Sequence, residues 1–304
     1  MFVPGAEDEA RTRTIKTGHL LLLLAPALLI ILLLFGGGLL LGSLQALGSQ
    51  PFTEKNSLTF AHFTAVLVDP DFATSFVMTL YIATVSTLVA VLASVALAMS
   101  LVRYAAANRV LNFFLQIPLT VPHLVIAISL LFLLAPTGIL SRLCSFFGIC
   151  EGADSFPLLI NDPYSISILL TYIWKEIPFI TFMILAVLKN SGNELEEVGR
   201  TLRANAWQRF CHITLPLIAP SLGAAGFIVF AFTFGAFEVP YLLGKTYPMV
   251  LPVWAYRNYT DIDLMARPEG IAIGLIIAVI VICSLLLSQG LMQIARRQRE
   301  YPGE

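Results

Sequence analysis

Two adjacent charged residues, Lys175 and Glu176, interrupt an otherwise apolar stretch at about 164–188. If this stretch crosses a membrane as a helix, a rise of about 1.5 Å per residue places both side chains near the bilayer centre. A charge at that depth costs on the order of 2.5–3.5 kcal/mol on insertion scales and therefore needs a function or a partner. Two roles fit the pair: contact with a solute or gate inside a pore, and an ion pair between helices or subunits.

Two further polar side chains, Thr120 and His123, accompany a pair of prolines within another apolar stretch. Pro118 and Pro122 each remove a backbone hydrogen bond from a helix. A membrane tolerates the freed carbonyls only where protein or a cavity meets them. Thr120 and His123 are therefore candidates for a solute pathway, and a packed, hydrogen-bonded histidine is the alternative for His123.

Glu238 follows the fifth apolar stretch, about 33 Å along a helix from Pro216. This distance places the carboxylate near the outer mouth of the protein and not at the membrane midplane. Glu238 is either a solvated helix end or an acidic gate. A partly buried carboxylate at such a gate would suit a cationic solute.

Cys144 and Cys150 fall in a loop that we expect outside the membrane, on the oxidising side. A disulfide between them fits that compartment, but sequence spacing does not fix the geometry of the two Cβ atoms. A disulfide and two free thiols both stay open. No cysteine and histidine spacing in the chain is typical of a metal site, so we expect none.

Six long apolar stretches position these residues. Of the 304 residues, 58% are hydrophobic and 12% charged, whereas soluble domains carry about 25% charged residues. Each stretch can cross the hydrocarbon as a helix, and each is too long for a barrel strand. The sequence predicts an all-α polytopic membrane protein with six transmembrane helices. We expect them at about 20–44, 75–102, 110–135, 165–188, 217–241 and 270–294.

The basic residues orient these helices. With both termini inside, twelve Lys and Arg lie in inner segments and five in outer loops, as the positive-inside rule requires. We therefore expect cytoplasmic tails at 1–18 and 296–304 around a membrane domain at 19–295. The first apolar run is longer than a signal peptide and has no clear cleavage site, so we expect an uncleaved helix. The net charge of −1 gives no indication of a nucleic-acid partner.

The second inner loop, 189–216, has the most regular pattern. Asn193 and Glu196 resemble a capping box, and Pro216 ends the helical pattern. The opposite face mixes acidic and basic residues, which suits a protein partner better than lipid headgroups; a helix lying on lipid is the alternative. The apolar residues recur at spacings of three and four, as on one face of a helix. They are Leu195, Val198, Leu202, Ala206 and Phe210.

This loop resembles the "EAA loop" of ABC importer permeases, whose pattern is Glu-Ala-Ala-x3-Gly-x9-Ile-x-Leu-Pro. Arg203 falls at the Gly position, and the spacing is kept throughout. The resemblance covers about 72–295. The residues at the Glu, Ala, Ala, Ile, Leu and Pro positions are Glu197, Val198, Gly199, Ile213, Leu215 and Pro216.

The resemblance implies the fold of a type I importer permease, with a coupling helix between the fourth and fifth spans. This helix, including Leu202, Ala206 and Phe210, would dock on a dimer of a separate ATPase. The chain has no Gly-x-x-x-x-Gly-Lys-Ser/Thr phosphate loop. We therefore expect no enzyme activity and no bound cofactor here, with ATP and Mg on the ATPase. The other implied partners are a second permease chain, identical or homologous, an external solute-binding protein and the lipid of a bacterial inner membrane.

The segment 234–244 is similar to permeases of the spermidine/putrescine class, which has ferric-iron, sulfate and thiamine relatives. We expect a polyamine or another small organic cation as solute, with ferric iron or an oxyanion as the alternative. A secondary transporter that acts alone would explain the spans but not the patterned loop. A membrane enzyme would need a catalytic pair or a metal motif, and the sequence shows neither.

Overall fold

The computed structural model describes residues 17–49, 58–104, 109–190 and 194–300, and these ranges contain helices and no strand. The chain divides into two compact units, Met1–Ala61 and His62–Glu304. The predicted tails lie mostly outside the described residues, although the last helix continues to Glu300.

The first unit holds one apolar helix. It consists of α1 (Thr17–Ile31), a π-helical stretch (Leu32–Gly36) and α2 (Gly37–Ala46). Its Leu and Ile side chains are largely exposed, as is expected of a helix that faces lipid, since lipid tails are as apolar as leucine. This helix confirms the first predicted span.

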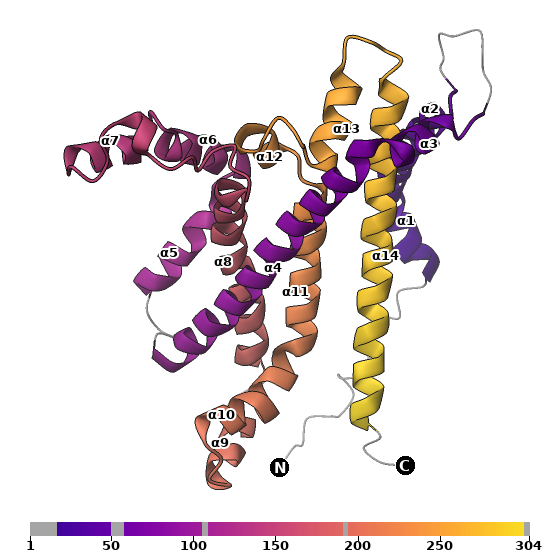
Figure 1. Ribbon diagram of the computed structural model, residues 1–304. Helices are drawn as coiled ribbons and strands as arrows, with labels where there is room; N and C mark the ends of the chain where they lie inside the picture. The colour runs from indigo at the N-terminus through magenta and orange to yellow at the C-terminus, as the bar shows by residue number, and fades with distance from the viewer. Residues whose placement is uncertain (1–16, 50–57, 105–108, 191–193, 301–304) are drawn as a thin grey trace. The chain divides into compact units, whose positions relative to one another are not determined.

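Among the described residues, twelve α-helices follow, and Figure 1 labels them. Five further helical segments are long and apolar enough to cross a membrane, at 70–102, 123–146, 166–190, 206–235 and 267–290. The predicted count of six apolar spans is therefore confirmed. The helices are α3 (Ala61–Val68), α4 (Pro70–Tyr104), α5 (Arg109–Thr120), α6 (His123–Leu134), α7 (Ile139–Phe146), α8 (Ile166–Asn190), α9 (Glu194–Thr201), α10 (Ala206–Arg209), α11 (Leu215–Gly235), α12 (Glu238–Leu243), α13 (Leu251–Thr260) and α14 (Arg267–Glu300).

The third predicted span, 110–135, is not a single helix. The chain breaks between Thr120 and His123, where α5 ends and α6 begins. In Figure 1, α6 and α7 run crosswise to α8, whereas α5 lies beside α8. The fifth predicted span is also divided, because α11 ends at Gly235 and the short helix α12 follows.

A stripe of small residues on α4 holds the centre of the second unit together. Its members are completely buried and lie on one face of the helix, against α8 and α11. Small side chains let helix backbones approach closely, which is the main source of packing energy between helices in lipid. On this stripe, the Ser94 hydroxyl donates to the carbonyl of Ile177 on α8 at 2.9 Å. The stripe consists of Ala83, Ser86, Ala90, Ser94 and Ala98.

The end of the unit that carries α12 and α13 is joined by hydrogen bonds between distant parts of the chain. The Leu251 amide at the start of α13 donates to the Thr79 hydroxyl on α4 at 2.9 Å. The Asn161 amide before α8 donates to the carbonyl of Leu243 on α12 at 3.0 Å. The Tyr247 hydroxyl donates to the carboxylate of Asp71, and this bond raises the pKa of Tyr247. These bonds fix the loops that close this end.

The loop between α8 and α11 differs from the single amphipathic helix that the stripe predicts. Helix α9 ends at Thr201, and Arg203 adopts a left-handed conformation with a φ of 56°. The Ala204 amide then donates to the carbonyl of Gly199 at 3.0 Å, a bond of the type that closes a helix at a left-handed residue. Glycine is favoured at such a position because it has no Cβ.

A second short helix, α10, begins beyond this turn. The Asn205 side chain accepts from the Gln208 amide at 2.8 Å, and the Gln208 side chain accepts from the Asn205 amide at 2.9 Å. This pair is a capping box and marks a new helix start. The predicted capping box began at Asn193, which lies outside the described residues.

Substitution of the small-residue stripe should weaken the packing of α4. Ala90→Leu inserts three carbon atoms into a fully buried contact and should cost about 1–3 kcal/mol. The thermal midpoint of the purified protein in detergent should therefore fall. Val89→Leu, at a neighbouring residue that is 41% exposed, should leave the midpoint unchanged, and equal midpoints for the two variants would contradict the packing described here.

Substitution of Arg203 should reveal the strain of its left-handed backbone. Arg203→Gly should relieve about 1–2 kcal/mol of steric cost and slow amide exchange in residues 194–209, measured by mass spectrometry. Arg203→Val should speed that exchange. Leu202→Val is the control, because the φ of Leu202 is not positive; identical exchange in the Gly and Val variants of Arg203 would refute the strain.

Candidate functional site

Lys175 supplies hydrogen bonds at the break between α5 and α6. Pro122 has no N–H, so the carbonyl of Pro118 lacks its usual helical donor. The Lys175 ammonium donates to that carbonyl at 3.0 Å and also to the carbonyl of Val121. The Val125 amide, whose regular helical acceptor would be the carbonyl of Val121, donates instead to that of Pro122 at 3.1 Å. Lys175 therefore bonds the two carbonyls that lack helical donors at this break, as a membrane requires.

Glu176 points to a different helix from its neighbour. The Thr233 hydroxyl on α11 donates to Glu176 Oε1 at 2.7 Å, and Glu176 is only 4% exposed. Its other oxygen, Oε2, and the fully buried hydroxyl of Tyr172 have no hydrogen-bond partner in the part of the chain that the structure describes. Within that part, neither Lys175 nor Glu176 forms an ion pair, and the two roles of the sequence analysis, solute contact and an ion pair between helices or subunits, stay predictions.

His123, the first residue of α6, is half-buried among aromatic rings. Its ring centroid lies 4.8 Å from that of Phe232 and 6.2 Å from that of Tyr172. The ring is packed as in the packed, hydrogen-bonded alternative of the sequence analysis, but it makes no hydrogen bond within the described residues, and the role of His123 stays a prediction. Thr120 is exposed at the end of α5, and its hydroxyl donates to the carbonyl of Ile117 at 2.9 Å. Lys175, His123 and Thr120 thus surround one break in the backbone.

Glu238 is not part of this break but is near it, since its charge acts on Tyr172, whose ring lies beside that of His123. It is exposed and begins α12, where a carboxylate is favourable at the positive end of a helix. Its position matches a solvated helix end, and no side chain of the break contributes a bond to it in the described ranges.

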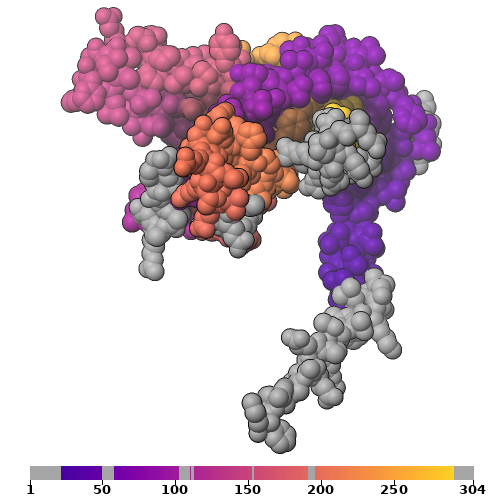
Figure 2. Space-filling view, turned by 90° about the horizontal axis from the view of Figure 1, so that it is seen from below, coloured from indigo at the N-terminus to yellow at the C-terminus, as the bar shows by residue number. Residues whose placement is uncertain are grey.

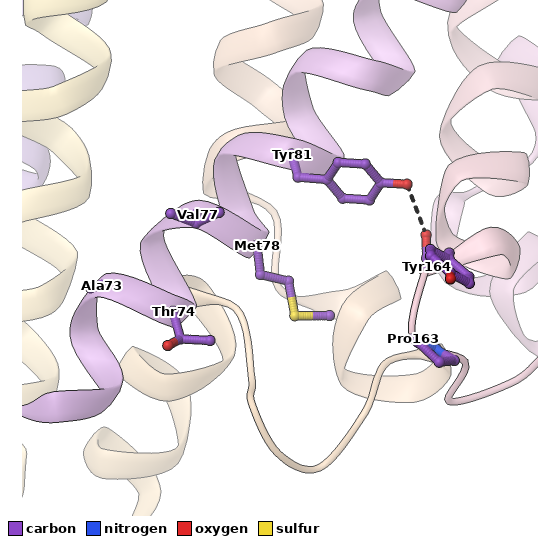
Figure 3. Close-up of a pocket in the computed structure, with 7 residues that line it drawn as sticks. All are labelled: Ala73, Thr74, Val77, Met78, Tyr81, Pro163 and Tyr164. Carbon is purple, nitrogen blue, oxygen red and sulfur yellow. Dashed lines mark hydrogen bonds between the residues drawn. The ribbon is translucent and has the colours of Figure 1, made fainter.

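A hollow of about 570 Å³ lies beside the first turns of α4 (Figure 3). The Tyr81 hydroxyl reaches across it and donates to the carbonyl of Tyr164, just before α8, at 3.3 Å. The lining is mostly apolar and carries no charged side chain. It consists of Ala73, Thr74, Val77, Met78, Tyr81, Pro163 and Tyr164, none of which was predicted as a pathway residue.

The loop of α9 and α10 follows the C-terminal end of α8, whereas the hollow lies near its N-terminal end. The loop protrudes there (Figure 1) and forms the salmon-to-orange surface in Figure 2. Large apolar side chains are exposed on it: Val198 is 55% exposed, Leu202 76% and Trp207 70%. Glu197 is exposed between them. The sequence analysis named Val198, Leu202 and Glu197 but missed Trp207, which its helical stripe did not include.

Close packing, ion pairs and a hydrogen bond hold the same loop in place. Gly199 is buried, and a Cβ at this position would lie 2.7 Å from the Ile213 Cδ1 atom. Glu196 pairs with Arg200 at 2.9 Å and with Arg209 at 3.8 Å, and Arg209 also donates to the carbonyl of Ala204 at 2.7 Å. Gly199 therefore permits close packing of α9 against the start of the α11 span. Arg209 is a second residue that the sequence analysis missed.

The remaining residues of the predicted coupling loop lie in α10 and in the first turns of the helix that follows it. Ala206 is exposed, and Phe210 is half-buried with its ring 5.6 Å from that of Trp207. Residues Phe210–Thr214 form a π-helical stretch that joins α10 to α11 without interruption, so that 206–235 is one helix. Leu215 and Pro216 are half-buried in its next turn.

Cys144 and Cys150 are free thiols in the structure, and the Cys150 amide donates to the carbonyl of Cys144 at 3.4 Å. The predicted disulfide stays a prediction. Among the described residues, no group of three His, Cys, Asp or Glu side chains is arranged to hold a metal ion.

Comparison with known proteins identifies the family of this chain. Residues 90–299 match the model of the family described as "Binding-protein-dependent transport system inner membrane component". The chain is 26% identical to the sulfate transport system permease protein CysT of Escherichia coli K12, over 76% of this chain and 79% of the relative. It is 25% identical to the molybdenum transport system permease protein ModB of Azotobacter vinelandii, over 53% of this chain and 68% of the relative.

Solved structures show the same fold. A bacterial ABC transporter involved in the import of the acidic polysaccharide alginate contains a chain with a TM-score of 0.72 and 21% identity, over 92% of this chain and 96% of that one. Because the family model matches more than two thirds of the sequence, the protein belongs to the inner-membrane components of binding-protein-dependent transport systems, the permease subunits of ABC importers.

Proposed function

We propose that this chain forms part of the solute pathway of an ATP-driven importer and is coupled to a separate ATPase through the exposed residues of α9 and α10. The observation that carries the proposal is the exposed apolar surface of Val198, Leu202 and Trp207, on a loop that ion pairs hold in place. A Trp is a typical anchor of a protein interface, and neighbouring exposed apolar side chains mark an interaction surface. The loop belongs to the cytoplasmic side in the predicted topology, with both termini inside.

The continuous helix at 206–235 supports a direct mechanical connection. A partner that moves Trp207 acts on the same helix that carries Thr233. Thr233 is bonded to Glu176 on α8, and α8 carries the Lys175 contact to the α5–α6 break. Closure of an ATPase dimer would therefore reach the centre of the membrane through three consecutive contacts and open the pathway alternately to each side.

The proposed assembly contains further chains. A second permease, identical or homologous, would complete the pathway, and an external binding protein would deliver the solute. A structure of the alginate ABC transporter in complex with an alginate-bound periplasmic protein has the same fold, with a TM-score of 0.72, which supports this arrangement. We place the assembly in a bacterial inner membrane, with ATP and Mg on the ATPase and no cofactor on this chain.

The solute that these charges favour is an anion. The sequence predicted a polyamine, with an oxyanion or ferric iron as the alternative. Glu176 is buried and accepts from Thr233, and Glu238 is at the start of α12, whereas Lys175 is partly exposed at the break between α5 and α6. Relatives named for sulfate and molybdenum, and a structural neighbour that imports an acidic polysaccharide, support the same choice.

Loss of the exposed apolar surface should uncouple the ATPase. Leu202→Asp and Glu197→Lys should reduce ATPase co-purification at least tenfold and abolish uptake, because removal of an interface anchor costs about 2 kcal/mol or more. Ile262→Asp is the control: this residue is completely exposed on the loop at the opposite end of the unit (Figure 1). Membrane insertion, measured by fractionation, should be normal in all three variants. Normal ATPase co-purification by Leu202→Asp and Glu197→Lys would refute the docking surface.

Removal of the Lys175 charge should weaken anion transport. Lys175→Gln keeps N–H donors for the two carbonyls but lacks the charge, so the half-saturation for sulfate or molybdate uptake should rise about tenfold while the thermal midpoint stays unchanged. Glu238→Gln is the control and should leave anion uptake unaltered. If Glu238→Gln reduces spermidine uptake and Lys175→Gln does not change it, the result would instead support a polyamine as the solute.

A further inference from the structure

We infer that Cys144 and Cys150 close an intramolecular disulfide at the outer end of α7. The placement of this end outside the cell rests on the proposed function, because α7 lies at the opposite end of α8 from the proposed coupling loop (Figure 1). The modification is an oxidation of two thiols that are already adjacent, and it closes a ring of seven residues.

The backbone has already turned so that the two cysteines meet. Helix α7 ends at Phe146, and Gly148 follows with a left-handed φ of 69°. The Gly148 amide donates to the carbonyl of Ser145 at 3.1 Å, and the Ile149 amide donates to that of Cys144 at 2.9 Å. These two bonds are the Schellman arrangement of a helix end. It brings the chain back over Cys144 immediately before Cys150.

The two cysteines are neighbours across this turn. The Cys150 amide lies 3.4 Å from the carbonyl of Cys144 and donates to it, so the backbones that carry the two thiols are held together. Both cysteines are half-buried, so an oxidant can still reach them. A disulfide therefore needs side-chain rotation and no rearrangement of the helix end.

Oxidation proceeds by exchange with a disulfide-bearing oxidoreductase of the outer compartment. Burial and the neighbouring Cys144 side chain raise the pKa of the Cys150 thiol, which makes Cys150 the poorer first nucleophile. The Cys144 thiolate attacks one sulfur of the oxidoreductase and releases the other as a thiolate. The Cys150 thiolate then attacks the Cys144 sulfur and releases the second. Two electrons and the two thiol protons pass to the oxidoreductase dithiol.

The residues between the two cysteines include three highly exposed apolar side chains at the end of α7. Phe146 is 82% exposed, Phe147 69% and Ile149 74%, and the two phenylalanine rings lie 5.4 Å apart. A crosslink between residues 144 and 150 prevents unwinding of the last turn of α7. It therefore keeps these side chains in one exposed group.

The test measures thiol reactivity of the full chain in intact cells, in a background with Cys211→Ser and Cys283→Ser. A membrane-impermeant maleimide should label neither remaining cysteine until a reductant is added, after which it should label both. With Cys144→Ser, Cys150 should be labelled without reductant. Mass spectrometry of the unreduced protein should show the 144–150 crosslink.

Other outcomes overturn the disulfide and separate it from the proposed topology. Labelling of both cysteines without reductant would show free thiols outside the cell. This result would refute the disulfide and support the proposed topology. Labelling only by a permeant maleimide would place the pair inside and overturn both. Protection that a chelator removes and a reductant does not would indicate a bound metal in place of the disulfide.

Discussion

A carbonyl group inside a membrane must find a donor within the protein, and this constraint explains the centre of the permease. The third apolar stretch divides into α5 and α6 at Pro122, which has no N–H for the carbonyl of Pro118, and the Val125 amide donates to Pro122 and not to Val121. The ammonium of Lys175 supplies both bonds from α8. The break and the intramembrane charge therefore depend on each other: without the lysine the joint is unsatisfied, and without the joint the lysine has no reason to lie at that depth.

This joint belongs to a tightly packed set of helices. Small residues from Ala83 to Ala98 bring α4 against α8 and α11, and the Glu176–Thr233 bond connects α8 to α11. Since lipid provides little hydrophobic force between helices, close packing and buried hydrogen bonds supply most of the stability. Side chains at the membrane centre therefore have few alternative positions, which makes them suitable for transmitting movement from one helix to another.

Much of this architecture can be predicted from the sequence, because six apolar stretches, two prolines and an intramembrane Lys-Glu pair are visible in it. The partners of the pair cannot be predicted, since adjacent residues face different helices and the sequence does not say which. The apolar stripe of the inner loop predicted one helix, whereas a left-handed turn at Arg203 produces two. Periodicity finds apolar faces but not a backbone reversal at a residue that seldom adopts one. The Asn205–Gln208 capping box was readable in the sequence, and it indicates the second helix start.

The π-helical stretch at Phe210–Thr214 has a consequence for chain length. A π turn accommodates one residue more than the α turn it replaces, and each residue of an α-helix adds about 100° of rotation. The direction in which Trp207 projects is thus set, relative to Thr233, by a single surplus residue. Deleting one residue within the stretch can be absorbed by conversion of the π turn to an α turn, whereas a deletion further along α11 rotates one end of the helix against the other. Relatives that differ in length are expected to differ at this wide turn and to keep the rest of the helix constant.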